Sequence, residues 1–314
     1  MPIVEPPQEI VVKVSNLTKC YGEFQAVDGI SFDVRKGEVF GFLGPNGAGK
    51  TTTARILTGV LKADSGSALV LGHPAGSLKA KQAMGVVPET ANPYADLSAW
   101  DNMMLMAELY GVPGRAAKER AIELLRELGL LERRKTLAKG YSKGMRQRLV
   151  LGMALISDPQ ILFLDEPTSG LDVQSARLMR SHLRTFNAKG KTIFITTHDM
   201  EEANQLCNRI AIINRGKIAA IDAPEKLKIA TRELHSVEVS FDHPVDATSV
   251  ASIQGVNTIK ESGDKFKLYT TDPGSLVSRL VHYAESNNLR IVTISTLAPS
   301  LEDAFVILVG DGEK

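Results

Sequence analysis

The chain has 314 residues, of which 43% are hydrophobic, 37 are basic and 36 are acidic, so its formal net charge is +1. This length predicts one large domain and a smaller one, and the near-neutral charge gives no global field that would favour nucleic acid or an anionic membrane. Two cysteines, Cys20 and Cys207, form neither a disulfide framework nor a metal cluster, which fits a reducing cytoplasm. The apolar runs are far shorter than the ~20 residues of a bilayer span, so we expect a soluble chain that another protein would hold at any membrane.

The N-terminal part of the chain reads as a tail followed by strands. Residues 1–9 have no signal-peptide pattern and are expected to be a flexible tail. Short apolar stretches then predict strands at 10–14, 30–34, 39–43 and 68–71. Apolar residues at helical spacing predict a helix within 53–61.

Helices dominate the next part of the chain, from Ser98 to about residue 156. Ser98 with Asp101 three residues later predicts a capped helix start, and this helix should end near Tyr110. A second helix is expected at 116–128, before Gly129. Further on, the sequence predicts buried strands at 161–164 and 193–196, a helix at 175–188 and a hairpin around 214–216.

A domain boundary is expected near residues 230–236, followed by a small α+β domain. Alternating apolar residues predict strands at 237–241 and 266–268, and a helix and a strand should follow at 276–284 and 290–294. Ser300 and Asp303 have the spacing of a helix cap. The histidines of this region are scattered, which favours surface or packing roles over metal ligation.

One glycine-rich run points directly to nucleotide chemistry. It consists of Gly44, Pro45, Asn46, Gly47, Ala48, Gly49, Lys50, Thr51 and Thr52. The order G-x-x-x-x-G-K-T between a strand and a helix is the P-loop pattern, in which backbone N–H groups and a helix N-terminus surround phosphate oxygens. Lys50 would reach the β- and γ-phosphates of ATP, and the Thr51 hydroxyl would bind Mg²⁺.

Two acids follow the apolar strand at 161–164. A buried strand would deliver Asp165 and Glu166 to the carboxyl edge of the sheet, where the phosphates of a P-loop site lie. Asp165 would hold Mg²⁺, and Glu166 would orient a water molecule toward the γ-phosphate. Taken alone, this pair is explained equally well as a strand that ends in an exposed acidic turn.

Four further motifs make the chain resemble the ABC-transporter ATPase family over about residues 10–225. The motifs are Tyr141-Ser142-Lys143-Gly144-Met145, similar to the family's signature; Ser169-Gly170-Leu171-Asp172, similar to its D-loop; His198, similar to its switch histidine; and Tyr21, similar to its adenine-stacking aromatic. The resemblance implies an α/β fold: a P-loop NTPase ABC ATPase core with an antiparallel β subdomain and a helical insertion, plus a small C-terminal α+β domain. The implied domains are 10–230, with the helical subdomain at about 90–158, and 235–314.

The resemblance also implies what these residues do. Ser142 and Gly144, at a helix start, would bind the γ-phosphate held by the P-loop of another subunit, so two ATP molecules would be sandwiched in a head-to-tail dimer. A homodimer is the simplest case, and a heterodimer with another ABC ATPase stays open. His198 would sense the γ-phosphate, and Tyr21 would stack on adenine, unless Phe24 takes that role or Tyr21 is a core aromatic.

The chain departs from the family pattern at two places. Glu89 stands where a glutamine normally touches Mg²⁺ and the attacking water, and we expect Glu89 to sharpen the dependence of hydrolysis on Mg²⁺. Lys143 and Met145 replace the usual glycine and glutamine of the signature. Lys143 would either place a cation near the partner's γ-phosphate or point to solvent, and the second is favoured because the family's essential contacts use the serine and the following glycine.

Finer features resemble the ABC-2 export subfamily. These are the signature variant, the Pro88-Glu89 pair and residues 300–305. Such ATPases are peripheral on the cytoplasmic face of the cell membrane and serve a separately encoded permease. Here the permease is expected to contact the surface formed by residues 89–101 and the helical insertion, with Tyr94 and Trp100 as candidates if they are not local core. The competing class, a soluble ABC ATPase acting on ribosomes or DNA, is disfavoured because the chain has no second cassette, coiled-coil insertion or basic surface, so no nucleic-acid partner is expected. No acceptor-binding or guanine-reading motif supports a kinase or a GTPase.

Overall fold

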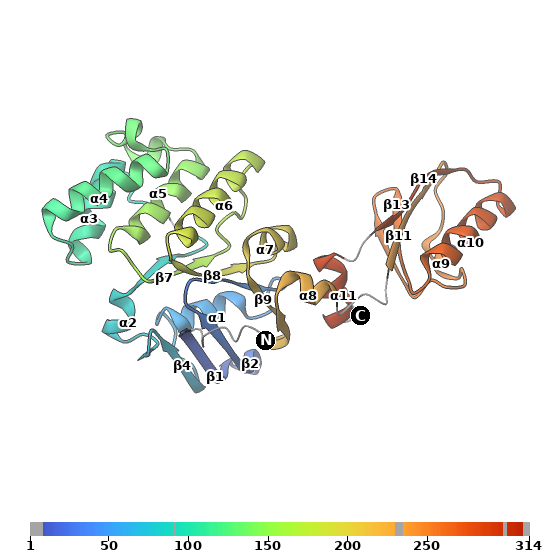
Figure 1. The fold of residues 1–314 in the computed structure, drawn as a ribbon, viewed down its shortest axis with the longest axis horizontal. Coiled ribbons are helices and arrows are strands. Elements are labelled where there is room, and N and C mark those ends of the chain that lie inside the picture. The colour runs from blue at the N-terminus through green and yellow to red at the C-terminus, as the bar shows by residue number, and fades with distance from the viewer. Residues whose placement is uncertain (1–8, 91, 230–234, 298–299, 310–314) are drawn as a thin grey trace, which may run out of the picture. The chain divides into compact units, whose positions relative to one another are not determined.

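A computed structural model describes residues 9–90, 92–229, 235–297 and 300–309 (Figure 1). The chain separates into two compact units, which divide between Pro224 and Glu225. Most of the predicted N-terminal tail and residues 230–234 of the predicted boundary lie outside the described residues.

A six-stranded sheet forms the centre of the first unit, with the order β10-β9-β3-β8-β7-β6. Its strands are β3 (Val39–Leu43), β6 (Met84–Val87), β7 (Ile161–Asp165), β8 (Thr192–Thr197), β9 (Arg209–Asn214) and β10 (Lys217–Asp222). All pairs are parallel except the β9–β10 hairpin. Every residue of β3, β7 and β8 is buried, because parallel strands are covered on both faces. The predicted strands and hairpin are confirmed, whereas β6 was missed.

An antiparallel sheet packs beside the central sheet, with the order β2-β1-β4-β5. Its strands are β1 (Ile10–Tyr21), β2 (Phe24–Arg35), β4 (Ser65–Val70) and β5 (His73–Pro74), and the short helix α2 (Leu78–Gln82) follows. Phe32 of this sheet stacks on Phe40 of β3 with ring centroids 5.6 Å apart, so the two sheets share one core. Strands β1 and β2 form a long hairpin, and the tight turn at its end connects Tyr21 to Phe24.

Helices cover both faces of the central sheet. Helix α1 (Lys50–Leu57) lies on the side of the antiparallel sheet, and α5 (Lys143–Leu155), α6 (Val173–Ala188) and α7 (Met200–Leu206) lie on the other side (Figure 1). Helices α3 (Ala99–Leu109) and α4 (Gly114–Glu127) pack with α5 as the helical insertion. The cap at Ser98 is confirmed, since its Oγ accepts a hydrogen bond from Asp101 N at 3.1 Å.

The second unit folds around a four-stranded antiparallel sheet. Along the chain its elements are β11 (His235–Phe241), α9 (Ala247–Ala251), β12 (Thr258–Ser262), β13 (Lys265–Thr270), α10 (Pro273–Ser286), β14 (Ile291–Leu297) and α11 (Leu301–Val309); α8 (Pro224–Ile229) lies at the division between the units. The strand order β12-β13-β11-β14 with this βαββαβ connectivity is a ferredoxin-like arrangement. The predicted α+β character is confirmed, although α9 and β12 were missed.

Helix α11 is fastened to the sheet of its unit by a buried ion pair. Asp303 Oδ1 lies 2.7 Å from Lys267 Nζ of β13, and the Asp303 side chain is only 2% exposed. The predicted cap is confirmed, because Ser300 Oγ accepts a hydrogen bond from Asp303 N at 3.1 Å. Burial raises the pKa of Asp303, but hydrogen bonds from Lys267 and Ser300 outweigh burial and hold that pKa below its ordinary value.

Candidate functional site

The P-loop leaves the buried strand β3 and turns into α1 through positions where only glycine fits. A Cβ on Gly44 would lie 2.3 Å from the backbone oxygen of Ile213. Gly49 has φ of +107°, and a Cβ there would lie 2.4 Å from the backbone oxygen of Ala26. These glycines therefore let the loop wedge between β9 and β2, with the N-terminus of α1 at its end.

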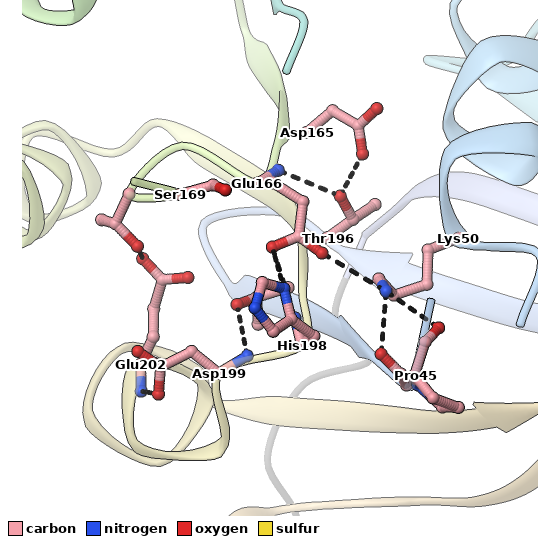
Figure 2. A network of polar contacts seen from close by, with 12 residues as sticks. Pro45, Lys50, Asp165, Glu166, Ser169, Thr196, His198, Asp199 and Glu202 are labelled. Atoms are coloured by element: carbon pink, nitrogen blue, oxygen red, sulfur yellow. Dashed lines mark hydrogen bonds and ion pairs between the residues drawn. The ribbon is translucent and has the colours of Figure 1, made fainter. Parts of the chain in front are cut away.

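Lys50 is buried at the mouth of this loop. Its Nζ donates hydrogen bonds to the carbonyl oxygens of Gly44 at 2.8 Å and Pro45 at 3.1 Å, and Glu166 Oε1 lies 3.3 Å away (Figure 2). The Lys50 side chain is only 5% exposed. Charge-assisted contacts in a buried site fix the ammonium group at one point, as an electrostatic anchor for phosphate requires.

Asp165 ends β7 beside the first turn of α1. Its Oδ1 accepts hydrogen bonds from Thr51 Oγ1 at 3.2 Å and from Thr196 Oγ1. Hydroxyl and carboxylate oxygens are the donors that Mg²⁺ prefers, and Mg²⁺ in phosphate sites is typically bound by one or two protein groups plus phosphates and waters. The donor set of Thr51 and Asp165 therefore fits Mg²⁺.

Glu166 turns away from β7 with an unusual backbone. Its φ is +49°, in the left-handed region that favours glycine, and its amide donates to Thr196 O at 3.0 Å. This turn aims the carboxylate into the site, where Oε2 lies 2.8 Å from Nδ1 of His198 (Figure 2). Glu166 is 7% exposed, so a strand ending in an exposed acidic turn is excluded.

The structure brings most of the predicted site residues together around one open cleft of about 250 Å³. Among the residues lining it are Tyr21, Asn46, Gly47, Gly49, Lys50, Thr51, Thr52, Glu89, Glu166 and His198. Gly44 and Pro45 instead bind Lys50 through their carbonyls, Ala48 is buried in the core, and Asp165 touches Thr51. Ser142 and Gly144 do not line the cleft.

Two aromatic rings border the cleft at the end of the β1–β2 hairpin. Tyr21 is 49% exposed and Phe24 is 59% exposed, and both line the cleft. Tyr21 is therefore not a core aromatic, and both rings are available for stacking on a planar base.

The signature residues begin helix α5. Ser142 is its N-cap and accepts a hydrogen bond from Met145 N at 3.3 Å. Lys143 is exposed, but its Nζ donates to the carbonyl oxygen of Ser169 in the D-loop at 2.9 Å. The favoured expectation that Lys143 simply points to solvent is therefore wrong for its ammonium group.

Sequence reasoning missed a buried carboxyl group behind the cleft. Asp199 caps α7 by accepting from the amides of Glu201 and Glu202, and Glu202 Oε1 accepts from Thr168 Oγ1 at 2.7 Å (Figure 2). Glu202 is fully buried, and burial raises its pKa. Its neighbours Asp199 and Glu201 are also acidic, so the sequence gives no signal that separates Glu202 from a solvated helix end.

Comparisons with known proteins match this geometry. Residues 27–169 match the family described as ABC transporter. The linearmycin resistance ATP-binding protein LnrL of Bacillus subtilis is 35% identical over 306 residues, which cover 96% of this chain and 98% of that protein. The Nod factor export ATP-binding protein I of Ralstonia nicotianae is 37% identical over 303 residues, covering 96% of this chain and 94% of that protein. The chain belongs to the ABC transporter ATP-binding proteins.

Solved structures agree with this assignment. A crystal structure described as the ADP conformation of an ATP-binding cassette of an ABC transporter has a TM-score of 0.62 and 25% identity, and the match covers 71% of this chain and 94% of that chain. A nucleotide-free cassette gives a TM-score of 0.63 with 26% identity, covering 70% of this chain and 94% of that chain. The predicted fold and nucleotide-binding ATPase activity are confirmed, and the alternative of a non-transport ABC ATPase is wrong.

Membership in this family also indicates how such proteins assemble. ABC ATP-binding proteins typically dimerise and pair with membrane-spanning components of a transporter. Within the residues that the structure describes, no helix is long and apolar enough to span a membrane.

Proposed function

We propose that this ABC transporter ATP-binding protein powers export through a separately encoded permease, from the cytoplasmic face of the membrane. The observation that carries the proposal is the contact of the buried Glu166 carboxylate with both Lys50 and the half-exposed His198. It joins a phosphate anchor, a water-orienting acid and a phosphate sensor at one cleft. A relative named for Nod factor export supports the direction of transport.

Hydrolysis at this cleft needs positioning more than strong bases. The P-loop amides and Lys50 would hold the β- and γ-phosphates, and Glu166 would orient a water whose oxygen attacks the γ-phosphorus as the bond to the ADP oxygen breaks. His198 would hold Glu166 in place and contact the γ-phosphate. Thr51, Asp165 and Glu89 would hold Mg²⁺, which neutralises charge on the phosphates when it is bound.

A head-to-tail homodimer accounts for the place of the signature. Ser142 and Gly144 lie at the start of a 13-residue helix and do not line their own chain's cleft. Helix starts attract anions, so Ser142 and Gly144 would bind the γ-phosphate held by the partner's P-loop. ATP would then close the dimer and hydrolysis would release it.

The permease would dock on the segment that follows Glu89. Tyr94 is 53% exposed, and its backbone is fixed by the fully buried Asn102, which accepts from Tyr94 N at 2.8 Å and donates to Tyr94 O at 3.0 Å. A fixed backbone that presents an exposed aromatic ring suits an interface anchor. Trp100 is half-buried and would contribute less contact area.

Copurification from detergent-solubilised membranes tests the proposal. The tagged chain should recover a permease with several membrane helices, and Tyr94→Asp should reduce that recovery. Ile10→Asp, which changes an exposed apolar residue of β1, serves as the matched control and should not reduce recovery. Recovery of soluble partners alone would contradict export through a permease.

A further inference from the structure

Lys143 connects two loops that are far apart in the sequence. Its Nζ lies 2.9 Å from the carbonyl oxygen of Ser169, which begins the D-loop. The next residue, Gly170, has φ of +63°, and a Cβ there would lie 2.3 Å from Lys143 Nζ. The Lys143 ammonium group therefore fits against the D-loop only because Gly170 has no side chain.

A second contact beside it holds the same two segments together. A Cβ on Gly144 would lie 2.4 Å from Ser175 Oγ, so the start of α5 packs directly on the first turn of α6. Ser175 is itself fixed, because its Oγ donates to Asp172 Oδ2 at 2.7 Å and Asp172 caps α6. The signature and the D-loop of one chain therefore meet at two points.

The two ends of this connection face different nucleotides in the proposed dimer. Ser169 lines the chain's own cleft together with Lys50 and Glu166. Ser142, the residue before Lys143, would bind the γ-phosphate in the partner's cleft. A displacement at either phosphate would reach the other through the Lys143–Ser169 contact.

We infer that Lys143 is a positioning residue that ties the signature to the D-loop of its own chain and thereby couples the two ATP sites. This inference rests on the proposed head-to-tail dimer. It differs from a role in which Lys143 binds the partner's γ-phosphate directly, because Lys143 would act through the contact of its ammonium group with the Ser169 carbonyl.

Mixed dimers with a single working site separate these two roles. Glu166→Gln on one chain silences that chain's cleft, and Lys143→Met is placed either on the same chain or on the opposite one. In the opposite arrangement, the working cleft has a loosened D-loop but faces a signature that retains Lys143. Coupling through Ser169 predicts that kcat falls about threefold to tenfold in both arrangements, the size expected for one charged hydrogen bond at an exposed position. Direct phosphate binding predicts a loss only when both substitutions share a chain.

Two controls keep the result specific. Lys143→Arg should restore kcat, and Lys217→Met, at an exposed lysine of β10 that pairs with Asp28, should leave kcat unchanged. An unchanged kcat in the opposite arrangement would overturn the inference and leave the proposed function intact. Failure of the Glu166→Gln parent to form ATP-dependent dimers would overturn the proposed dimer and the inference with it.

Discussion

Glu166 and His198 face each other with Oε2 and Nδ1 only 2.8 Å apart, although they follow different strands. The register of the sheet explains this contact, since Asp165 at the end of β7 pairs with Thr196 near the end of β8. The Glu166 amide also bonds to Thr196, which turns the carboxylate toward the neighbouring loop. Parallel strands thus deliver Glu166 and His198 to one edge of the sheet.

Replacing Glu166 by Gln should abolish turnover and leave nucleotide binding in place. The neutral amide neither orients the attacking water as a carboxylate does nor accepts its proton, and loss of these roles should lower the rate by about 10²- to 10⁴-fold. The chain should then persist as an ATP-bound dimer, which phosphate release and size-exclusion chromatography would measure. Glu201→Gln, at an exposed residue of α7, is the control, and turnover unchanged in Glu166→Gln would remove Glu166 from its role.

Glu89→Gln should change how hydrolysis depends on Mg²⁺. Glu89 lines the cleft, and its carboxylate would add a negative charge beside the metal. The variant should need about threefold to tenfold more Mg²⁺ for half-maximal rate, because Coulomb attraction to the ion is lost. Rates measured against Mg²⁺ at fixed ATP check this, with Glu285→Gln of the second unit as control; superimposable curves for wild type and Glu89→Gln would refute it.

The sequence predicts the residues of the site better than it predicts the strands that support them. The P-loop, Asp165, Glu166 and His198 follow apolar strands, so their meeting at one sheet edge is predictable. β6 was missed because only four residues, Met84–Val87, form it, and two of them are methionine and glycine, which lack the β-branched signal of a strand.

Contacts between distant loops could not be predicted at all. The bond from Lys143 to the Ser169 carbonyl spans 26 residues and uses a backbone acceptor, which any residue carries. Burial of Glu202 depends on the packing of α7, and the acidic residues beside it in the sequence give no sign of that burial. Tertiary structure alone assigns these partners.

The buried carboxyl group of Glu202 predicts a pH dependence of stability. Burial raises its pKa above the ordinary value of 4.5, so the folded chain binds this proton more tightly than the unfolded chain does. Its contribution to the free energy of unfolding therefore falls as pH rises from about 4.5 through the folded pKa. Glu202→Gln keeps an oxygen for Thr168 and should reduce the loss of stability between mildly acidic and alkaline pH, because the amide does not titrate.

Urea unfolding of the wild type and Glu202→Gln at several pH values measures this effect. Glu201→Gln, which changes the exposed neighbour, should keep the wild-type pH profile. Parallel profiles for all three proteins would contradict a raised pKa of Glu202 in the folded chain.

The buried pair of Asp303 should stabilise the attachment of α11 at neutral pH and lose this effect in acid. Its lowered pKa means that the folded state favours the ionised form, so the contribution is full above 3.8 and is lost as pH falls through the folded pKa. Asp303→Asn should lower the protection of α11 amides from hydrogen exchange at neutral pH, by an amount equivalent to about 1–3 kcal/mol.

The neighbouring residue provides the comparison for Asp303. Glu302 pairs with Lys260 at the surface, where both side chains are nearly half exposed, so Glu302→Gln should change protection by less than about 1 kcal/mol. Equal protection in Asp303→Asn and Glu302→Gln would contradict the fastening role of the buried pair.

Mixing two inactive variants tests the central claim most directly. Lys50→Ala removes the phosphate anchor and Ser142→Ala removes the signature hydroxyl, so each variant alone should lack hydrolysis. In a head-to-tail dimer of one chain of each, the intact P-loop of one chain faces the intact signature of the other. The mixture should therefore recover about a quarter of wild-type activity, since half of the dimers are mixed and each has one working site. A mixture that stays as inactive as its components would contradict an ATP site built from two chains.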